Sequence, residues 1–311
     1  MLVPGAYLGD ESARAATHVS VEIGDQPAAW SRAAELGLTD DVRHVLPERG
    51  QRVAVVGCGT SLFMAQSFAA LRESSGHGET DAFPASEFPT RRSYDTLLAL
   101  TRSGTTTEVL RLLEAQRGKG GPRTVVITAD PEAPVAKLAD HRVVLDFADE
   151  KSIVQTRFAT TSLALWRAWL GEDLTAVVGQ GRSALADPLP GRLLDSAQFT
   201  FVGSGMSIGI ANEAALKLRE ASQSWTESYP AMEFRHGPIS VIGHGSTVWV
   251  FGQPPSGLLE DIRPTGAHVE NSGLDPMADL IRAQRLAVAL AEAKGLNPDQ
   301  PRNLTRSVVL S

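Results

Sequence analysis

Three charged residues on one predicted helix have the types and spacing needed to move protons. Glu213 and Lys217 are four residues apart and Glu220 follows three later, so all three share one face. A carboxylate held beside an ammonium group can act as a general base. A solvated ladder of salt bridges has the same spacing. His236, before a rigid Gly-Pro turn, is a candidate proton shuttle, although a lone histidine is more often structural.

A second group of residues has the chemistry of an anion site. The segment 101–107 (Thr-Arg-Ser-Gly-Thr-Thr-Thr) follows a predicted strand and precedes a predicted helix. Its hydroxyls, its glycine and the helix N-terminus favour phosphate. The alternative is plain helix capping, since Glu108 follows as a helix-start acid. The turn 57–61 would face the same end of the sheet, where ligands of open α/β sheets bind.

These residues need an α/β framework to position them. Apolar runs predict strands at 53–57, 96–100, 124–128 and 142–146 in the first half, and at 199–202, 248–251 and 267–270 in the second. Helices are predicted at 62–72, 106–117, 134–139, 208–222 and 276–294. The strand–turn–helix unit at 53–61 recurs at 199–207, which indicates an internal duplication. We therefore expect two doubly wound parallel-sheet domains in tandem, of flavodoxin-like type, the second abbreviated.

The chain divides into four segments on this interpretation. Residues 1–46 form an N-terminal helical extension, 47–175 the first domain, 190–296 the second domain and 297–311 a C-terminal tail that closes the site. The Gly- and Pro-containing stretch 176–192 is predicted to be a linker. Both glycine turns lack the third glycine of a dinucleotide fingerprint, with Leu62 and Ile208 in its place, so no NAD is expected.

Composition excludes several classes of partner. The chain has 311 residues and a net charge of −7, and its first 50 residues have no basic face, so nucleic acid is not expected. No apolar run reaches the roughly 18 residues of a membrane span. There is no signal-peptide pattern, and the single cysteine, Cys58, permits no internal disulfide, so a cytoplasmic protein is expected. The spacing of possible ligands predicts no metal site.

Six motifs in order resemble the sugar isomerase (SIS) domain pair. They are Gly57–Ser61, Ala85–Phe88, Ser103-Gly104 with Thr106, Glu213–Glu220, Arg235–Pro238 and Asp299–Leu304, with a further match at Glu22–Pro27. The same pair forms the isomerase domain of glutamine–fructose-6-phosphate aminotransferase and stand-alone enzymes that isomerise, deaminate or deglycate sugar 6-phosphates. The resemblance implies a phosphosugar isomerase or deaminase acting on an amino-sugar or keto-sugar 6-phosphate, with no cofactor.

The resemblance also implies roles for individual residues. Glu220 would move a proton between C1 and C2, His236 of the other subunit of a homodimer would assist ring opening, and Lys217 would lie near the sugar. The substrate and its phosphate would contact Gly59, Thr60, Ser61, Thr101, Arg102, Ser103, Thr106, Ile153, Gln155 and Arg306.

Departures from the family pattern keep other functions open. Arg306 stands where the family has an imine-forming lysine, and a guanidinium stays protonated. Arg102 lies inside a family Ser-Gln-Ser motif, and a strand and a helix are missing between about 262 and 276. No glutaminase segment is present, so synthesis from glutamine is not expected. The alternatives are a fructosamine-6-phosphate deglycase and a sugar-phosphate sensor without turnover.

Overall fold

A five-stranded parallel sheet forms the first half of the chain. The computed structural model describes residues 16–118 and 120–310. The strands are β1 (Val53–Gly57), β2 (Thr80–Pro84), β3 (Thr96–Leu100), β4 (Arg123–Thr128) and β5 (His141–Val144), in the order β2-β1-β3-β4-β5. Every residue of β1 and β3 is buried, as expected of central parallel strands with helices on both faces.

A second parallel sheet repeats the first with one strand fewer. It contains β6 (Gln198–Gly203), β7 (Trp225–Pro230), β8 (Ser246–Val250) and β9 (His268–Glu270), in the order β7-β6-β8-β9. This order matches that of the first four strands of the first sheet. The glycines that end β1 and β6 have the same role: a Cβ on Gly57 would lie 2.6 Å from Ser61, and one on Gly203 would lie 2.2 Å from Ser207. Only glycine lets each helix pack this closely against its strand.

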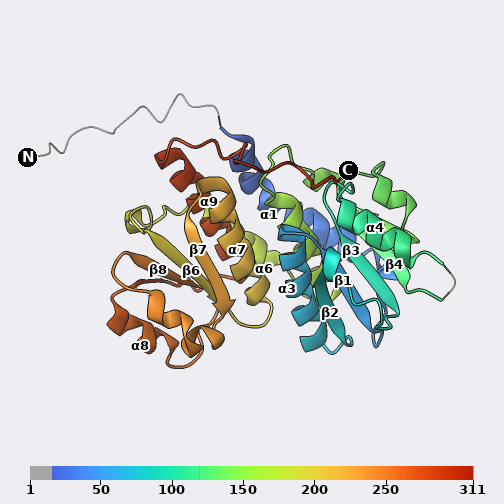
Figure 1. Ribbon diagram of the computed structural model, residues 1–311, viewed down its shortest axis with the longest axis horizontal. Coiled ribbons are helices and arrows are strands. Elements are labelled where there is room, and N and C mark those ends of the chain that lie inside the picture. Colours follow the sequence, from blue (N-terminus) through green and yellow to red (C-terminus); the bar gives the residue numbers. More distant parts are fainter. Residues whose placement is uncertain (1–15, 119, 311) are drawn as a thin grey trace, which may run out of the picture.

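Helices cover the sheets and fill the space between them (Figure 1). They are α1 (His18–Gly37), α2 (Asp40–Val45), α3 (Thr60–Ser74), α4 (Thr107–Gln116), α5 (Arg157–Trp169), α6 (Thr175–Ala186), α7 (Ser207–Ser222), α8 (Leu258–Ile262) and α9 (Pro276–Ala293). None of the helices in the described residues is long and apolar enough to cross a membrane.

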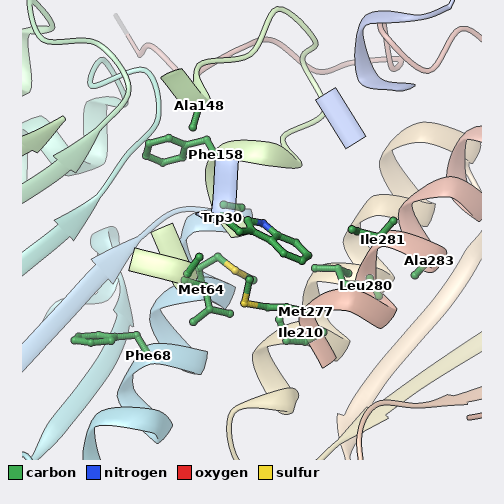
Figure 2. Close-up of a cluster of buried hydrophobic side chains, with 14 of the residues drawn as sticks. Trp30, Met64, Phe68, Ala148, Phe158, Ile210, Met277, Leu280, Ile281 and Ala283 are labelled. Atoms are coloured by element: carbon green, nitrogen blue, oxygen red, sulfur yellow. The ribbon is translucent and has the colours of Figure 1, made fainter. Parts of the chain in front are cut away.

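One hydrophobic core joins the two halves. Figure 2 shows side chains from α1, α3, α5, α7 and α9 meeting around Trp30, which is fully buried. Met64 and Phe68 come from α3, and Ile210 comes from α7. Full burial of each such side chain contributes about 1.5–3 kcal/mol. The shared core therefore fixes α3 relative to α7, and both helices supply residues to the site described below.

The predicted linker at 176–192 is wrong. Residues 175–186 form α6, which packs against α1 and α9, and only the remainder lacks α-helix. Gly181 does not serve as a flexible hinge: a Cβ there would lie 2.7 Å from the ring of Trp30. The glycine instead permits close packing, which a sequence pattern read for flexibility does not distinguish.

Other elements differ in extent from the sequence prediction. The helix expected at 134–139 is only a short 3-10 turn at Pro134–Lys137, and the strand expected at 142–146 is β5 at His141–Val144. Strands β2 and β7 and helix α5 were not predicted. The N-terminal extension contains α1 and α2, while its first 15 residues lie outside the described part. The last helix agrees closely, and Gly295 follows it with φ 68°.

Candidate active site

A pocket of about 190 Å³ opens at the carboxyl ends of β1 and β3. The strand order reverses between these two neighbours, which is where ligands bind in open α/β sheets. The pocket lining includes ten of the predicted ligand residues and the predicted base: Gly59, Thr60, Ser61, Thr101, Arg102, Ser103, Thr106, Ile153, Gln155, Arg306 and Glu220. The fold thus brings together residues from five separate segments of the sequence.

Two helix N-termini point toward one end of this pocket. Helix α3 begins at Thr60, and α4 begins at Thr107 after the hydroxyl-rich turn that follows β3. Thr106 is the N-cap residue of α4, but its hydroxyl makes no capping hydrogen bond. Plain capping therefore does not account for this threonine. The hydroxyl of Thr106 and two positively polarised helix ends suit an anion such as phosphate.

Glu220 reaches the pocket from α7 with Lys217 beside it. The Lys217 Nζ lies 2.5 Å from Oε2 of Glu220 and donates to Oγ1 of Thr60 at 3.0 Å. The side chain of Lys217 is 1% exposed and that of Glu220 is 19% exposed. The alternative of a solvated salt-bridge ladder is therefore wrong. Helix α3 covers the lysine, and only the end of the triplet that carries Glu220 opens to the pocket.

Glu213, the third member of the triplet, is completely buried. Its Oε1 lies 3.5 Å from Nζ of Lys217, and neither carboxyl oxygen has a hydrogen-bond partner in the described residues. Burial raises the pKa of Glu213 to about 8, against the opposing effect of Lys217. Burial alone would lower the pKa of Lys217, but Glu213 and Glu220 raise it above its usual value. We conclude that Lys217 is protonated and that its charge is directed at Glu220.

Arg102 is buried in the pocket wall and holds a neighbouring loop. Its Nη1 lies 3.4 Å from Oε2 of Glu150 and donates to the carbonyl of Ser152 at 3.2 Å. Glu150 also accepts hydrogen bonds from the backbone N–H groups of Thr156 (2.6 Å) and Arg157 (2.7 Å). The charge of Arg102 is thus largely satisfied by the protein. It orders the 150–155 loop, which brings Ile153 and Gln155 into the pocket.

The C-terminal residues 304–308 form another wall of the pocket. Figure 1 shows the final segment, in red, crossing from the end of α9 to the first sheet. The backbone N–H of Thr107 donates to the carbonyl of Val308 at 3.1 Å. Arg306 pairs with Asp149 (2.5 Å) and donates to the carbonyl of Glu150. Its guanidinium therefore binds the loop wall, and its own carbonyl accepts from Arg102 at 3.2 Å.

His236 does not line this pocket. It ends a short 3-10 turn (Glu233–His236) after β7, and it is exposed. Cys58 does line the pocket, but burial and, to a smaller extent, the nearby Glu108 raise the pKa of its thiol to about 11. That thiol is not a ready nucleophile. In the described part of the chain, no three His, Cys, Asp or Glu side chains are grouped to hold a metal ion.

The sequence prediction did not name some residues that the structure places at the pocket. Leu304, Thr305, Ser307 and Val308 line it together with Arg306. Residues 297–311 were predicted to form a tail that closes the site, but Arg306 was the only tail residue named as a ligand. A short polar and apolar tail has no periodicity that would identify which of its residues face a ligand.

Comparisons with known proteins agree with the geometry. Residues 48–168 match the family model described as SIS domain. The chain is 25% identical to glutamine–fructose-6-phosphate aminotransferase of Sulfurisphaera tokodaii, covering 93% of this chain and 56% of that protein. It is 27% identical to the corresponding protein of Chlamydia pneumoniae, covering 93% and 58% respectively. The chain therefore spans little more than half the length of these curated relatives.

Two solved structures share the fold over nearly their whole length. Glucosamine-6-phosphate deaminase from Thermotoga maritima aligns with a TM-score of 0.80 and 25% identity, covering 94% of this chain and 100% of that one. Tagatose-6-phosphate ketose/aldose isomerase from Escherichia coli aligns with a TM-score of 0.77 and 20% identity, covering 95% and 97%. The second likeness concerns the fold alone.

Proposed function

We propose that this protein, whose residues 48–168 match the SIS domain model, is an enzyme acting on a sugar 6-phosphate by moving a proton between C1 and C2. The substrate would be an amino-sugar or keto-sugar 6-phosphate, and the similar structure of a glucosamine-6-phosphate deaminase supports this class. The observation that carries the proposal is that one pocket combines hydroxyls and two helix N-termini with a carboxylate paired with a buried ammonium group.

The two ends of the pocket would have different roles, one binding the phosphate and the other transferring the proton. Hydroxyls of Ser61, Thr101, Ser103 and Thr106, with the N-termini of α3 and α4, would hold the phosphate. A phosphate fixed in this way places the sugar chain in one orientation, which removes much of the entropic barrier.

Glu220 would then act on the open-chain sugar. As a carboxylate it would take the proton from C2 of an aldose, leaving an enediol or enolamine, and return it to C1. The Nζ of Lys217 lies 2.5 Å from Oε2 of Glu220 and would hold this carboxylate in position for the transfer. Thr60 orients the lysine in turn through the hydrogen bond at 3.0 Å. With an amino group at C2, the resulting imine can be hydrolysed by water to release ammonia.

His236 would assist ring opening in the pocket of a second copy of the chain. Two observations support a shared site: His236 is exposed and away from its own pocket, and the same segment exposes Met232 (51%) and Val241 (60%). Apolar side chains exposed around a functional histidine are suited to an interface. We therefore propose a homodimer in which each pocket contains Glu220 of one chain and His236 of the other.

Mixing two inactive variants tests the shared site. If Glu220→Gln and His236→Ala dimers exchange subunits, half of the dimers would be mixed and each would hold one intact site, giving about one quarter of wild-type activity. A mixture that exchanges subunits, as shown by tagged copies, and stays inactive would contradict the shared site.

Proton exchange tests the reaction itself. The protein is incubated with glucosamine 6-phosphate or fructose 6-phosphate in heavy water, and loss of the C1 or C2 proton is followed by NMR with ammonia assayed in parallel. Exchange with ammonia release indicates a deaminase, and exchange alone an isomerase. Glu220→Gln should abolish exchange while still binding the sugar phosphate. Binding without exchange by the wild type would instead favour a sensor, or a deglycase that acts on a fructosamine 6-phosphate.

A further inference from the structure

Helix α1 contacts both pocket walls that lie outside the first sheet. One wall is the 150–155 loop, and the other is the C-terminal tail, residues 297–310. At the start of the tail, the carboxylate of Asp299 accepts the backbone N–H groups of His18 and Val19, each at 2.8 Å. These are the first two residues of α1. A residue 280 positions away in the sequence thus caps the helix and fixes the root of the tail.

Glu22 binds the loop from the next turn of the same helix. It is 4% exposed, and its Oε1 accepts the backbone N–H groups of Lys151 (2.5 Å) and Ser152 (3.2 Å). Its Oε2 accepts the hydroxyl of Ser152. The loop lies outside helices and strands, so this carboxylate supplies partners for backbone groups that secondary structure leaves unpaired.

Burial disfavours the charged form of Glu22, and the hydrogen bonds that Glu22 accepts from the loop must offset this cost. Burial raises its pKa, the hydrogen bond from Ser152 opposes the rise, and the charge of nearby Glu150 adds to it. Glu150 is in turn paired with Arg102 in the pocket wall. Two carboxylates, one on α1 and one in the loop, are therefore held close together only because the loop backbone and Arg102 bind them. Such an arrangement specifies one loop conformation.

The two walls also contact each other. Arg306 of the tail donates to the carbonyl of Glu150 and pairs with Asp149. Tail and loop thus form one connected unit, anchored to α1 at Asp299 and at Glu22. We infer that Glu22 and Asp299 are positioning residues that act from the first two turns of α1 to hold the loop and the tail over a bound sugar phosphate. The inference rests on the proposed function for the ligand.

The test compares Glu22→Gln, Asp299→Asn and the double variant with Glu35→Gln, a matched change at an exposed position of α1. Backbone hydrogen exchange of peptides covering residues 150–156 and 304–310 is measured by mass spectrometry, with and without fructose 6-phosphate. Binding of fructose 6-phosphate and of inorganic phosphate is measured by calorimetry. None of these readouts requires turnover, so they remain valid if the proposed reaction is wrong.

We expect Glu22→Gln to speed exchange in the loop and Asp299→Asn to speed it in the tail, with little change elsewhere. Each variant should weaken fructose 6-phosphate binding by about tenfold, as for loss of a charge-assisted hydrogen bond, and inorganic phosphate by less. Because the walls contact each other, the affinity of the double variant for fructose 6-phosphate should fall by less than the product of the two single-variant fold-changes. If the enzyme turns over, KM should rise more than kcat falls.

Two results would overturn the inference. One is loop and tail exchange in the variants equal to that of the Glu35→Gln control. The other is hydrogen exchange that becomes faster to the same extent across the whole chain, which indicates a general loss of stability and no local positioning role. Should Glu22→Gln fail to fold, Ser152→Ala removes the hydroxyl donor while keeping the carboxylate. That variant should speed loop exchange selectively, and an unchanged loop would count against the inference.

Discussion

Replacing Glu213 by glutamine should make the stability of the protein less dependent on pH. Glu213 is 0% exposed, and burial raises the pKa of its carboxyl from 4.5 to about 8. In the unfolded chain the same carboxyl ionises near its usual value. Between these two values the folded protein therefore holds one more proton at this position, and its free energy of unfolding falls as pH rises.

The size of this pH dependence follows from a difference of one bound proton between the folded and unfolded states. A difference of one bound proton changes the free energy of unfolding by up to about 1.4 kcal/mol per pH unit. Glutamine cannot ionise and has nearly the shape of the neutral acid. The free energy of unfolding of the variant, taken relative to that of the wild type, should thus rise by up to about 3 kcal/mol between pH 5.5 and 7.5. Its extra unpaired N–H costs about 1–3 kcal/mol, but that cost does not depend on pH.

Urea unfolding at several pH values measures this difference. Wild type, Glu213→Gln and the exposed control Glu292→Gln are compared at half-unit steps from pH 5.5 to 8.5. Other buried acids, such as Glu22, are common to all three proteins and cancel. The expected curve of variant minus wild type rises with pH and levels off above about 8. A flat difference would mean that Glu213 is ionised in the folded protein, and the assignment of a neutral acid beside Lys217 would be wrong.

Three further predictions concern buried residues around the pocket and the core. Arg102→Met should lower the free energy of unfolding by about 3–5 kcal/mol, because it leaves the buried Glu150 carboxylate unpaired, and urea unfolding measures the loss. Gly181→Val should lower it by about 1–3 kcal/mol, because its side chain would overlap the ring of Trp30; Gly181→Ala, with fewer added atoms, should lower it less. Cys58 should react with iodoacetamide at pH 7.5 at least about a hundredfold more slowly than glutathione, because its pKa of about 11 leaves little thiolate; a rate similar to glutathione's would contradict that pKa.

The central strands could be predicted from sequence because burial on both faces leaves a simple signal. Strands β1 and β3 are continuous apolar runs, and both were predicted. The edge strands β2 and β7 were missed. Their sequences, Thr80–Pro84 and Trp225–Pro230, mix acids, prolines and aromatics, and most of their residues are partly exposed. Each has a single neighbour, and sheet pairing with that neighbour imposes a conformation that local preference does not indicate.

For the site too, local spacing predicts one part of the arrangement, and contacts between distant segments determine the rest. Helical spacing alone places Glu213, Lys217 and Glu220 on one face, but such spacing is most typical of a solvated salt-bridge ladder and does not identify a proton-transfer site. What decides between them is α3, whose Thr60 receives a hydrogen bond from Lys217 across 157 residues of sequence. That contact depends on the shared core that joins the two sheets, and no local pattern encodes it. A buried lysine between two glutamate side chains is therefore a property of the packed pair of α/β units, and the chemistry we propose for Glu220 depends on their association as much as on the motif itself.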